Sequence, residues 1–153
     1  LGHGLPIACG MALSAKILNL KFRTFVLLGD GECNEGTVWE AALFASSKNL
    51  NNLIAIVDFN GWQGIGKTKS ILNLNPFADK WKSFGWNVKV VNGHNHKQLY
   101  KNLKNKYSKP TVLIANTVKG KGVSFMEDNP AFHGAAPSDE QLAIALSELG
   151  VSS

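Results

Sequence analysis

A short apolar run that ends in a turn decides the fold of this chain: FVLLGDG, residues 25–31. Four consecutive apolar residues that stop at Gly-Asp-Gly are typical of a buried strand, because a strand covered on both faces has no polar side. Similar apolar runs at residues 53–57, 88–91 and 111–115 predict three further strands. Together the four runs predict a sheet that is covered on both faces.

Helical patterns alternate with these runs and predict five helices, at residues 6–18, 38–48, 76–84, 97–107 and 138–149. Pro6 suits a first helical turn, and capping-box spacings at residues 37–40 and 138–141 mark two helix starts. Residues 62–75 and 117–137 are expected to form loops. Strands that alternate with helices predict an α/β domain with a mainly parallel sheet and helices on both faces.

The composition is that of an ordinary globular domain. The chain has 153 residues, of which 44% are hydrophobic and 18% are charged, so residues 1–153 are predicted to form a single domain rather than a disordered chain. No apolar run is long enough for a membrane helix. The chain opens at Leu1 in an apolar, glycine-rich segment without Met, and we expect it to be part of a longer chain, truncated at its N-terminus.

The two cysteines, Cys9 and Cys33, are too few for a disulfide framework or a four-cysteine zinc site. We therefore expect reduced thiols and a cytoplasmic location.

The net charge of +5 is concentrated in residues 80–109, which hold eight lysines and no acidic residue. Aromatic residues between the lysines, including Trp81 and Trp86, suggest a nucleic-acid surface as one interpretation. The other interpretation is a solvated helix face, which we favour because there is no arginine cluster and no known nucleic-acid motif. We expect neither a nucleic-acid partner nor a membrane partner.

The turn after the first strand could bind a phosphate group through a metal ion. Gly29 and Gly31 let the backbone approach a ligand closely, and the helix that opens near residue 36 adds a positive dipole end. Asp30 would repel the phosphate unless a cation such as Mg²⁺ lay between the two anions.

Further oxygen ligands follow the second strand, at the same predicted edge of the sheet. These are the side chain of Asn60 and the backbone carbonyl of Trp62. Taken alone, each motif is more simply interpreted as a turn. Their occurrence at the ends of successive strands favours a metal and phosphate site. The sequence has neither a Walker A motif nor a dinucleotide fingerprint.

The spacing from the Gly-Asp-Gly turn to Asn60 resembles the thiamine diphosphate fingerprint, and GDGECNEGTVWEA (29–41) resembles the transketolase family. Other strings similar to that family are LGHG (1–4), VDFN (57–60), NGH (92–94), TVKGKG (117–122) and FHGAAP (132–137). The resemblance covers essentially the whole chain. It implies the thiamine diphosphate-binding fold of a diphosphate-binding (PP) domain and a transketolase-type transferase.

The resemblance also implies roles for individual residues. Asp30 and Asn60 would bind Mg²⁺ through their side chains and Trp62 through its carbonyl, with Ca²⁺ or Mn²⁺ as substitutes. Gly31, in the turn that Gly29 opens, would donate its N–H to the diphosphate of thiamine diphosphate. The catalytic residue would be His133, which would contact the diphosphate and the reacting centre and handle a proton.

Other implied roles concern the edges of the site. Leu1 and Gly2 would lie near the aminopyrimidine ring of the cofactor, and Glu35 would lie at a subunit interface. His94 and His96 are interpreted as helix-entry residues rather than zinc ligands. The lysines at 119 and 121 would either attract a sugar phosphate or form an exposed turn.

The resemblance also indicates what the chain lacks. No residue matches the family's glutamate that activates the cofactor, because that glutamate belongs to a separate pyrimidine-binding domain. The expected partner is therefore a C-terminal, pyrimidine-domain transketolase subunit, in a homodimer or heterotetramer. The pair would transfer a two-carbon ketol unit from a ketose phosphate to an aldose phosphate, as in the pentose phosphate reactions of carbohydrate metabolism.

Two alternatives stay open. One is another thiamine diphosphate-dependent subunit, for specialised sugar or acyloin synthesis. The other is a catalytically inactive interaction module with the same fold.

Overall fold

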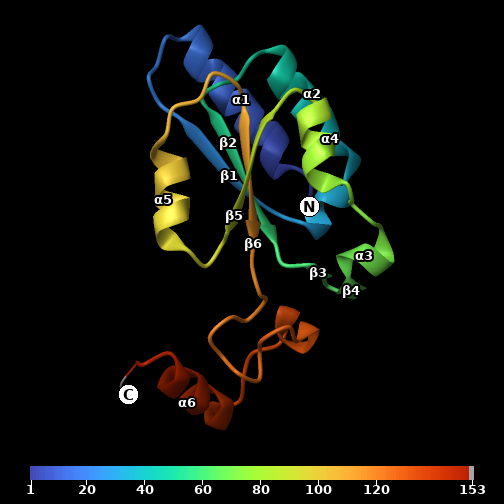
Figure 1. The fold of residues 1–153 in the computed structure, drawn as a ribbon, viewed down its shortest axis with the longest axis vertical. Helices are drawn as coiled ribbons and strands as arrows, with labels where there is room; N and C mark the ends of the chain where they lie inside the picture. Colours follow the sequence, from blue (N-terminus) through green and yellow to red (C-terminus); the bar gives the residue numbers. More distant parts are fainter. Residues whose placement is uncertain (152–153) are drawn as a thin grey trace.

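The computed structural model describes residues 1–151 and contains a four-stranded sheet with helices around it (Figure 1). The strands of this sheet are β1 (Thr24–Gly29), β2 (Leu53–Phe59), β5 (Asn87–Asn92) and β6 (Thr111–Asn116). A small hairpin consists of β3 (Trp62–Gln63) and β4 (Gly66–Lys67). The helices are α1 (Gly4–Ile17), α2 (Gly36–Ser47), α3 (Thr68–Ile71), α4 (Phe77–Ser83), α5 (His96–Lys104) and α6 (Asp139–Glu148), with 3₁₀ helices η1 (Gly31–Asn34) and η2 (Pro130–His133).

All neighbouring strands of the main sheet are parallel, in the order β1-β2-β6-β5, as the sequence predicts. Gly29 lies beside Asp58, and Phe59 lies beside Asn116, so β1, β2 and β6 end at one edge of the sheet. The hairpin and the segment after β6 extend from this edge (Figure 1). The polar turns that follow the strands are therefore brought together there.

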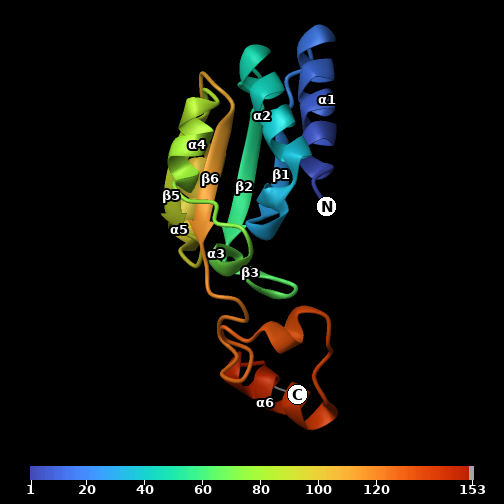
Figure 2. The same cartoon turned by 90° about the vertical axis from the view of Figure 1, so that its right-hand side faces the viewer.

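The predicted helices on both faces are confirmed. Helices α1, α2 and α4 cover one face, and α5 lies on the other (Figure 2). The second face is only partly covered, since Phe25 and Leu27 of the edge strand β1 are 45% and 69% exposed. The prediction that all of 25–28 is buried is therefore wrong for these two residues, because α5 packs beside β5 at the opposite side of the sheet.

Two local predictions fail near the carboxyl edge. The capping box at 37–40 is wrong, because the N-cap of α2 is Glu35, which makes no side-chain cap bond. The hydroxyl of Thr37 instead donates to the carbonyl of Gly2 at 2.9 Å. The predicted loop at 62–75 contains β3, β4 and α3, because the chain turns at residues 64–65 and pairs with itself.

The capping box at the start of α6 is confirmed. The N–H of Gln141 donates to the Ser138 hydroxyl at 3.3 Å, and the N–H of Ser138 donates to the Gln141 side chain at 2.9 Å. No helix within residues 1–151 has both the length and the apolar character needed to cross a membrane.

The core between the sheet and α4 is aromatic. Trp81 is fully buried, and its ring centroid lies 4.9 Å from that of Trp86 and 5.2 Å from that of Trp39. Trp86 is also buried. Buried rings are not available for stacking on nucleic-acid bases, which argues against this role for Trp81 and Trp86, whereas Tyr100 in the same segment is 66% exposed.

Both cysteines are expected to resist alkylation in the folded protein. They are buried free thiols, and burial raises the pKa of Cys9 to about 11 and that of Cys33 to about 12. At about pH 8, roughly one molecule in a thousand or fewer would carry the reactive thiolate. Mass spectrometry after iodoacetamide treatment should find both thiols unmodified in native buffer and modified after denaturation. Rapid labelling of the native protein would contradict this.

Candidate functional site

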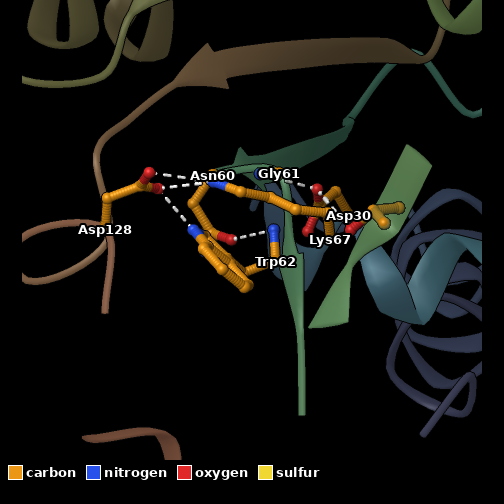
Figure 3. A network of polar contacts seen from close by, with 7 residues as sticks. Asp30, Asn60, Gly61, Trp62, Lys67 and Asp128 are labelled. Atoms are coloured by element: carbon orange, nitrogen blue, oxygen red, sulfur yellow. Dashed lines mark hydrogen bonds and ion pairs between the residues drawn. The ribbon is translucent and has the colours of Figure 1, made fainter. Parts of the chain in front are cut away.

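Three chain segments meet beyond the carboxyl ends of the strands (Figure 3). The turn after β1 carries Asp30, and the turn after β2 carries Asn60 and leads to Trp62 in β3. The third segment is the long loop after β6, which reaches the hairpin through Asp128. This edge is where parallel sheets of α/β proteins bind their ligands.

Asp30 is a buried carboxylate that is contacted by neutral donors. It is 1% exposed. One oxygen accepts from the N–H of Gly31 at 2.9 Å, and the other accepts from the N–H of Gly61 at 2.9 Å and the Thr68 hydroxyl at 3.0 Å. Burial raises the pKa of Asp30, and these hydrogen bonds offset part of the rise. Since no ion pair involves Asp30 within residues 1–151, a cation would compensate a buried charge.

Asn60 is held in a fixed orientation by its neighbours. Its Nδ2 donates to a carboxylate oxygen of Asp58 at 3.0 Å, and its Oδ1 accepts the N–H of Trp62 at 2.9 Å. The other oxygen of Asp58 accepts from the hydroxyl of Thr117. An amide oxygen has two acceptor positions, so one of those of Asn60 is left for a hard cation. Among residues 1–151, no three His, Cys, Asp or Glu side chains gather as a metal cluster.

Gly31 lies directly against the side chain of Gln63. A Cβ atom at Gly31 would be 2.6 Å from the Cγ of Gln63, so a larger residue would displace the hairpin side chain. Nε2 of Gln63 is buried and has no hydrogen-bond partner in the described part of the chain. The N–H of Gly31 points to Asp30, so a diphosphate oxygen would have to share or replace that contact. The unpaired amide beside it is a group that a phosphate oxygen would satisfy.

His133 ends η2 and is exposed. Its Nε2 and Cδ2 atoms lie 3.4 Å from the position that a Cβ atom would take at Gly64, in the turn of the hairpin. The loop after β6 therefore returns to the hairpin that follows Asn60. This contact places the histidine at the same edge of the sheet as the proposed metal ligands.

The start of the chain lies beside the turn after β1. Glu32 accepts the N–H of Gly2 at 2.9 Å through one oxygen and the N–H of Gly29 at 3.2 Å through the other. Gly2 has a φ of 80°, and a Cβ atom there would be 2.8 Å from the Cβ of Glu35. Leu1 is 86% exposed, and Glu35 is exposed at the N-cap of α2. Both exposed side chains are thus available to another molecule.

An open cleft of about 540 Å³ lies next to Asn60, and its lining includes Asp58, Gly93, Thr117, Lys119 and Lys121. Nε2 of His94 accepts the N–H of Val118 at 2.8 Å, which ties one wall of the cleft to the segment before α5. His94 directly precedes Asn95, the N-cap of α5, so it lies at the entry to the helix as expected, but this position does not describe its whole role. His94 also holds the loop after β6.

The whole chain matches one known family. The family described as transketolase, thiamine diphosphate binding domain, matches residues 1–153. The chain belongs to this family. Its fold superposes on a transketolase from Campylobacter jejuni subsp. jejuni with a TM-score of 0.93 and 30% identity, over 98% of this chain and 25% of that chain.

Two relatives of this transketolase domain are named as subunits. An apulose-4-phosphate transketolase subunit of Actinobacillus succinogenes is 44% identical over 151 residues, which are 97% of this chain and 55% of the relative. The 6-deoxy-6-sulfo-D-fructose transketolase subunit SqwG of Clostridium sp. (strain MSTE9) is 40% identical over 152 residues, which are 97% of this chain and 55% of that relative. The chain thus spans about half the length of the curated relatives it matches. The resemblance inferred from the sequence is confirmed for the family and the fold.

Sequence reasoning missed several residues that lie near the carboxyl ends of the strands in this transketolase domain. Glu32 and Thr68 support the first turn, and the ion pair between Lys67 and Asp128 connects hairpin and loop. Hydrogen bonds from Lys67 and Trp62 lower the pKa of Asp128. A glutamate next to Gly-Asp-Gly could have been suspected from its position. Lys67 and Asp128 are 61 positions apart, and no pattern in the sequence connects them.

Proposed function

We propose that this chain is the diphosphate-binding part of a split transketolase, completed by a partner subunit that carries the pyrimidine-binding domain. The family match and the two relatives named as transketolase subunits support this proposal. With its partner, the protein would transfer a two-carbon ketol unit from a ketose phosphate to an aldose phosphate. Thiols that are buried and free are compatible with a cytoplasmic enzyme.

The observation that carries the proposal is the buried carboxylate of Asp30, which has three neutral donors and stands at the strand edge with Asn60 and Trp62. A carboxylate, an amide oxygen and a backbone carbonyl are hard oxygen ligands of the kind that Mg²⁺ takes together with phosphates and water. Asp30, Asn60 and the Trp62 carbonyl would hold the ion. Ca²⁺ or Mn²⁺ could replace it, since both accept the same ligand class.

The diphosphate would lie beside Gly31. The amide of Gln63 provides a buried donor without a partner at this point, and the N-terminus of α2 begins five residues further on, at Gly36. A helix N-terminus favours negative charge. Leu1 and Gly2 would flank the aminopyrimidine ring, because the Glu32 carboxylate holds Gly2 next to the turn that Gly29 opens.

Bound thiamine diphosphate would supply the nucleophilic carbon and the electron sink of the reaction. His133 would hold or move a proton at its Nε2, which lies at the exposed side of the hairpin turn. The lysines at 119 and 121 line the cleft beside Asn60 and would attract a phosphorylated sugar. Glu35 would contact another subunit of a homodimer or heterotetramer.

A turnover assay with the pyrimidine-domain partner tests this proposal. Ketose phosphate donors and aldose phosphate acceptors should react only when both subunits, Mg²⁺ and thiamine diphosphate are present. His133→Asn should lower kcat by about 100-fold, because a positioned proton carrier contributes on that order. His96→Asn, an exposed histidine at the start of α5, is the matched control and should keep full activity.

The alternatives give different results in the same assay. Turnover confined to other donors or acceptors would favour an enzyme of specialised sugar or acyloin synthesis. Cofactor binding without turnover of any sugar in the panel would favour an inactive interaction module.

A further inference from the structure

One carboxylate joins the loop after β6 to the β3–β4 hairpin (Figure 3). The oxygens of Asp128 lie 2.8 and 2.9 Å from Nζ of Lys67, and one of them also accepts the indole N–H of Trp62. Nζ of Lys67 lies 3.7 Å from the centroid of the Trp62 ring. Trp62 and Lys67 are paired across the hairpin. We refer to Trp62, Lys67 and Asp128 as the clasp.

The clasp fixes Trp62 from three sides. Its backbone N–H donates to Asn60 at 2.9 Å, its indole N–H donates to Asp128, and its ring lies under the Lys67 ammonium. The N–H of Trp62 belongs to the peptide before the residue and its carbonyl to the peptide after it, so these contacts act on the carbonyl by restricting rotation of the residue that joins the two peptides. The direction of the Trp62 carbonyl, the third proposed metal ligand, therefore depends on the clasp.

The residue that carries this carboxylate also begins the segment that leads to His133. The N–H of Asp128 donates to the carbonyl of Lys119 at 2.9 Å, and the side chain of Asn129 then accepts the N–H of Ala131 at 3.0 Å as the N-cap of η2. η2 ends at His133, whose ring lies against Gly64. The segment 128–133 therefore touches the base of the hairpin through Asp128 and its turn through His133.

Asp128 adopts a conformation that needs external support. Its φ is 53°, in the left-handed region that residues with a side chain rarely adopt. The hydrogen bond to Lys119 and the contacts of the clasp hold it there. The ion pair is exposed, with Lys67 and Asp128 side chains 45% and 61% accessible, so it adds little to global stability. Its effect should be on local order.

We propose that Asp128 is a positioning residue, which acts through Lys67 and Trp62 to hold the metal-binding turn and the His133 segment against one hairpin. The proposal rests on the proposed function for the identity of the ligand. The clasp itself can be tested without cofactor.

The test compares Asp128→Asn and Lys67→Gln with Asp79→Asn in the full natural chain, together with its partner subunit. Asp79→Asn is the matched control, because it breaks an exposed ion pair of similar length, 2.9 Å to Lys82, on α4. Without cofactor, amides of residues 62–67 and 128–133 should exchange hydrogen about fivefold faster or more in the two clasp variants only. The NMR signal of the Trp62 indole N–H should move in both clasp variants.

Binding is measured next, by titration of thiamine diphosphate in the presence of Mg²⁺. The apparent Kd should rise about three- to tenfold in both clasp variants, with the thermal midpoint of the cofactor-free protein close to wild type. A double variant should lose less affinity than the sum of the two single losses, since both single variants break the Lys67–Asp128 ion pair.

The outcomes distinguish a failure of the clasp proposal from a failure of the proposed function. If exchange of residues 128–133 is as slow in Asp128→Asn as in Asp79→Asn, the clasp does not hold this segment and the proposal is overturned. Faster exchange with an unchanged Kd overturns the positioning role. If the wild-type protein binds no cofactor, the proposed function fails, whereas the exchange rates still report on the clasp.

Discussion

Replacing Asp30 by Ala is expected to abolish the magnesium-dependent binding of thiamine diphosphate, with affinity weakened by about 100-fold or more. Asp30 is the charged member of the proposed donor set, and Asn60 and the Trp62 carbonyl are neutral. Neutral oxygens bind Mg²⁺ more weakly than a carboxylate does, so the two that remain would hold the ion loosely. Without the ion, the diphosphate would meet only the weak dipoles of backbone and amide groups.

Thermal unfolding measures this loss. At a ligand concentration of about one hundred times the wild-type Kd, binding should stabilise the wild-type protein by roughly 2.7 kcal/mol and the Ala variant, whose Kd is about 100-fold higher or more, by about 0.4 kcal/mol or less. Asp79→Ala, which removes an exposed carboxylate on α4, is the control and should keep the full shift. If the ligand stabilised Asp30→Ala as much as the wild-type protein, Asp30 would not be the metal ligand.

The stability of the cofactor-free variant shows whether the fold survives. Ala leaves the Gly31 and Gly61 N–H groups and the Thr68 hydroxyl without their acceptor, which costs about 1–3 kcal/mol for each donor that water does not reach, but it also removes a buried carboxylate. These two effects oppose each other. A folded variant that binds no cofactor is therefore the expected result.

Trp81→Ala is expected to cost about 3–5 kcal/mol of unfolding free energy, the largest effect on stability that we predict. Trp81 is fully buried between Trp39, Phe77 and Trp86, so the deletion leaves a cavity that rigid rings cannot fill. Urea unfolding followed by circular dichroism measures this cost. A loss below about 1 kcal/mol would mean that the aromatic core is not packed as described.

Replacement by Phe separates packing from hydrogen bonding. Nε1 of Trp81 is buried and has no partner within residues 1–151, whereas Nε1 of Trp86 donates to the Ala42 carbonyl at 2.9 Å. Trp81→Phe removes an unsatisfied donor together with some apolar area, whereas Trp86→Phe removes a buried hydrogen bond that is satisfied. Trp86→Phe should therefore be the more destabilising of the two, by about 1 kcal/mol.

Much of the fold could be predicted because the strands are short apolar runs with clear ends. The runs at 53–57 and 111–115 are nearly fully buried, and both predict the central strands well. The run at 25–28 failed in part, because local composition does not tell an edge strand from a central one. The hairpin at 62–67 was missed because two-residue strands have no periodicity to detect.

The proposed metal ligands could be predicted for a similar reason. Asp30 and Asn60 directly follow strands, and the parallel register alone brings their turns together. Contacts between side chains far apart in sequence could not be predicted. Lys67 meets Asp128, and Glu32 holds Gly2, only after the loops have folded over the sheet edge. The metal-binding roles of Asp30, Asn60 and Trp62 stay predictions, as do the roles that the family implies for the other site residues, which are Leu1, Gly2, Gly29, Gly31, Glu35 and His133.

Calorimetric titration of thiamine diphosphate into the protein with its partner subunit tests the central claim most directly. One titration contains Mg²⁺, and a second contains EDTA in place of the metal. We predict saturable binding with Mg²⁺ and none with EDTA, because the buried carboxylate of Asp30 excludes a diphosphate that arrives without a cation. Equal binding in both titrations, or no binding in either, would contradict the account.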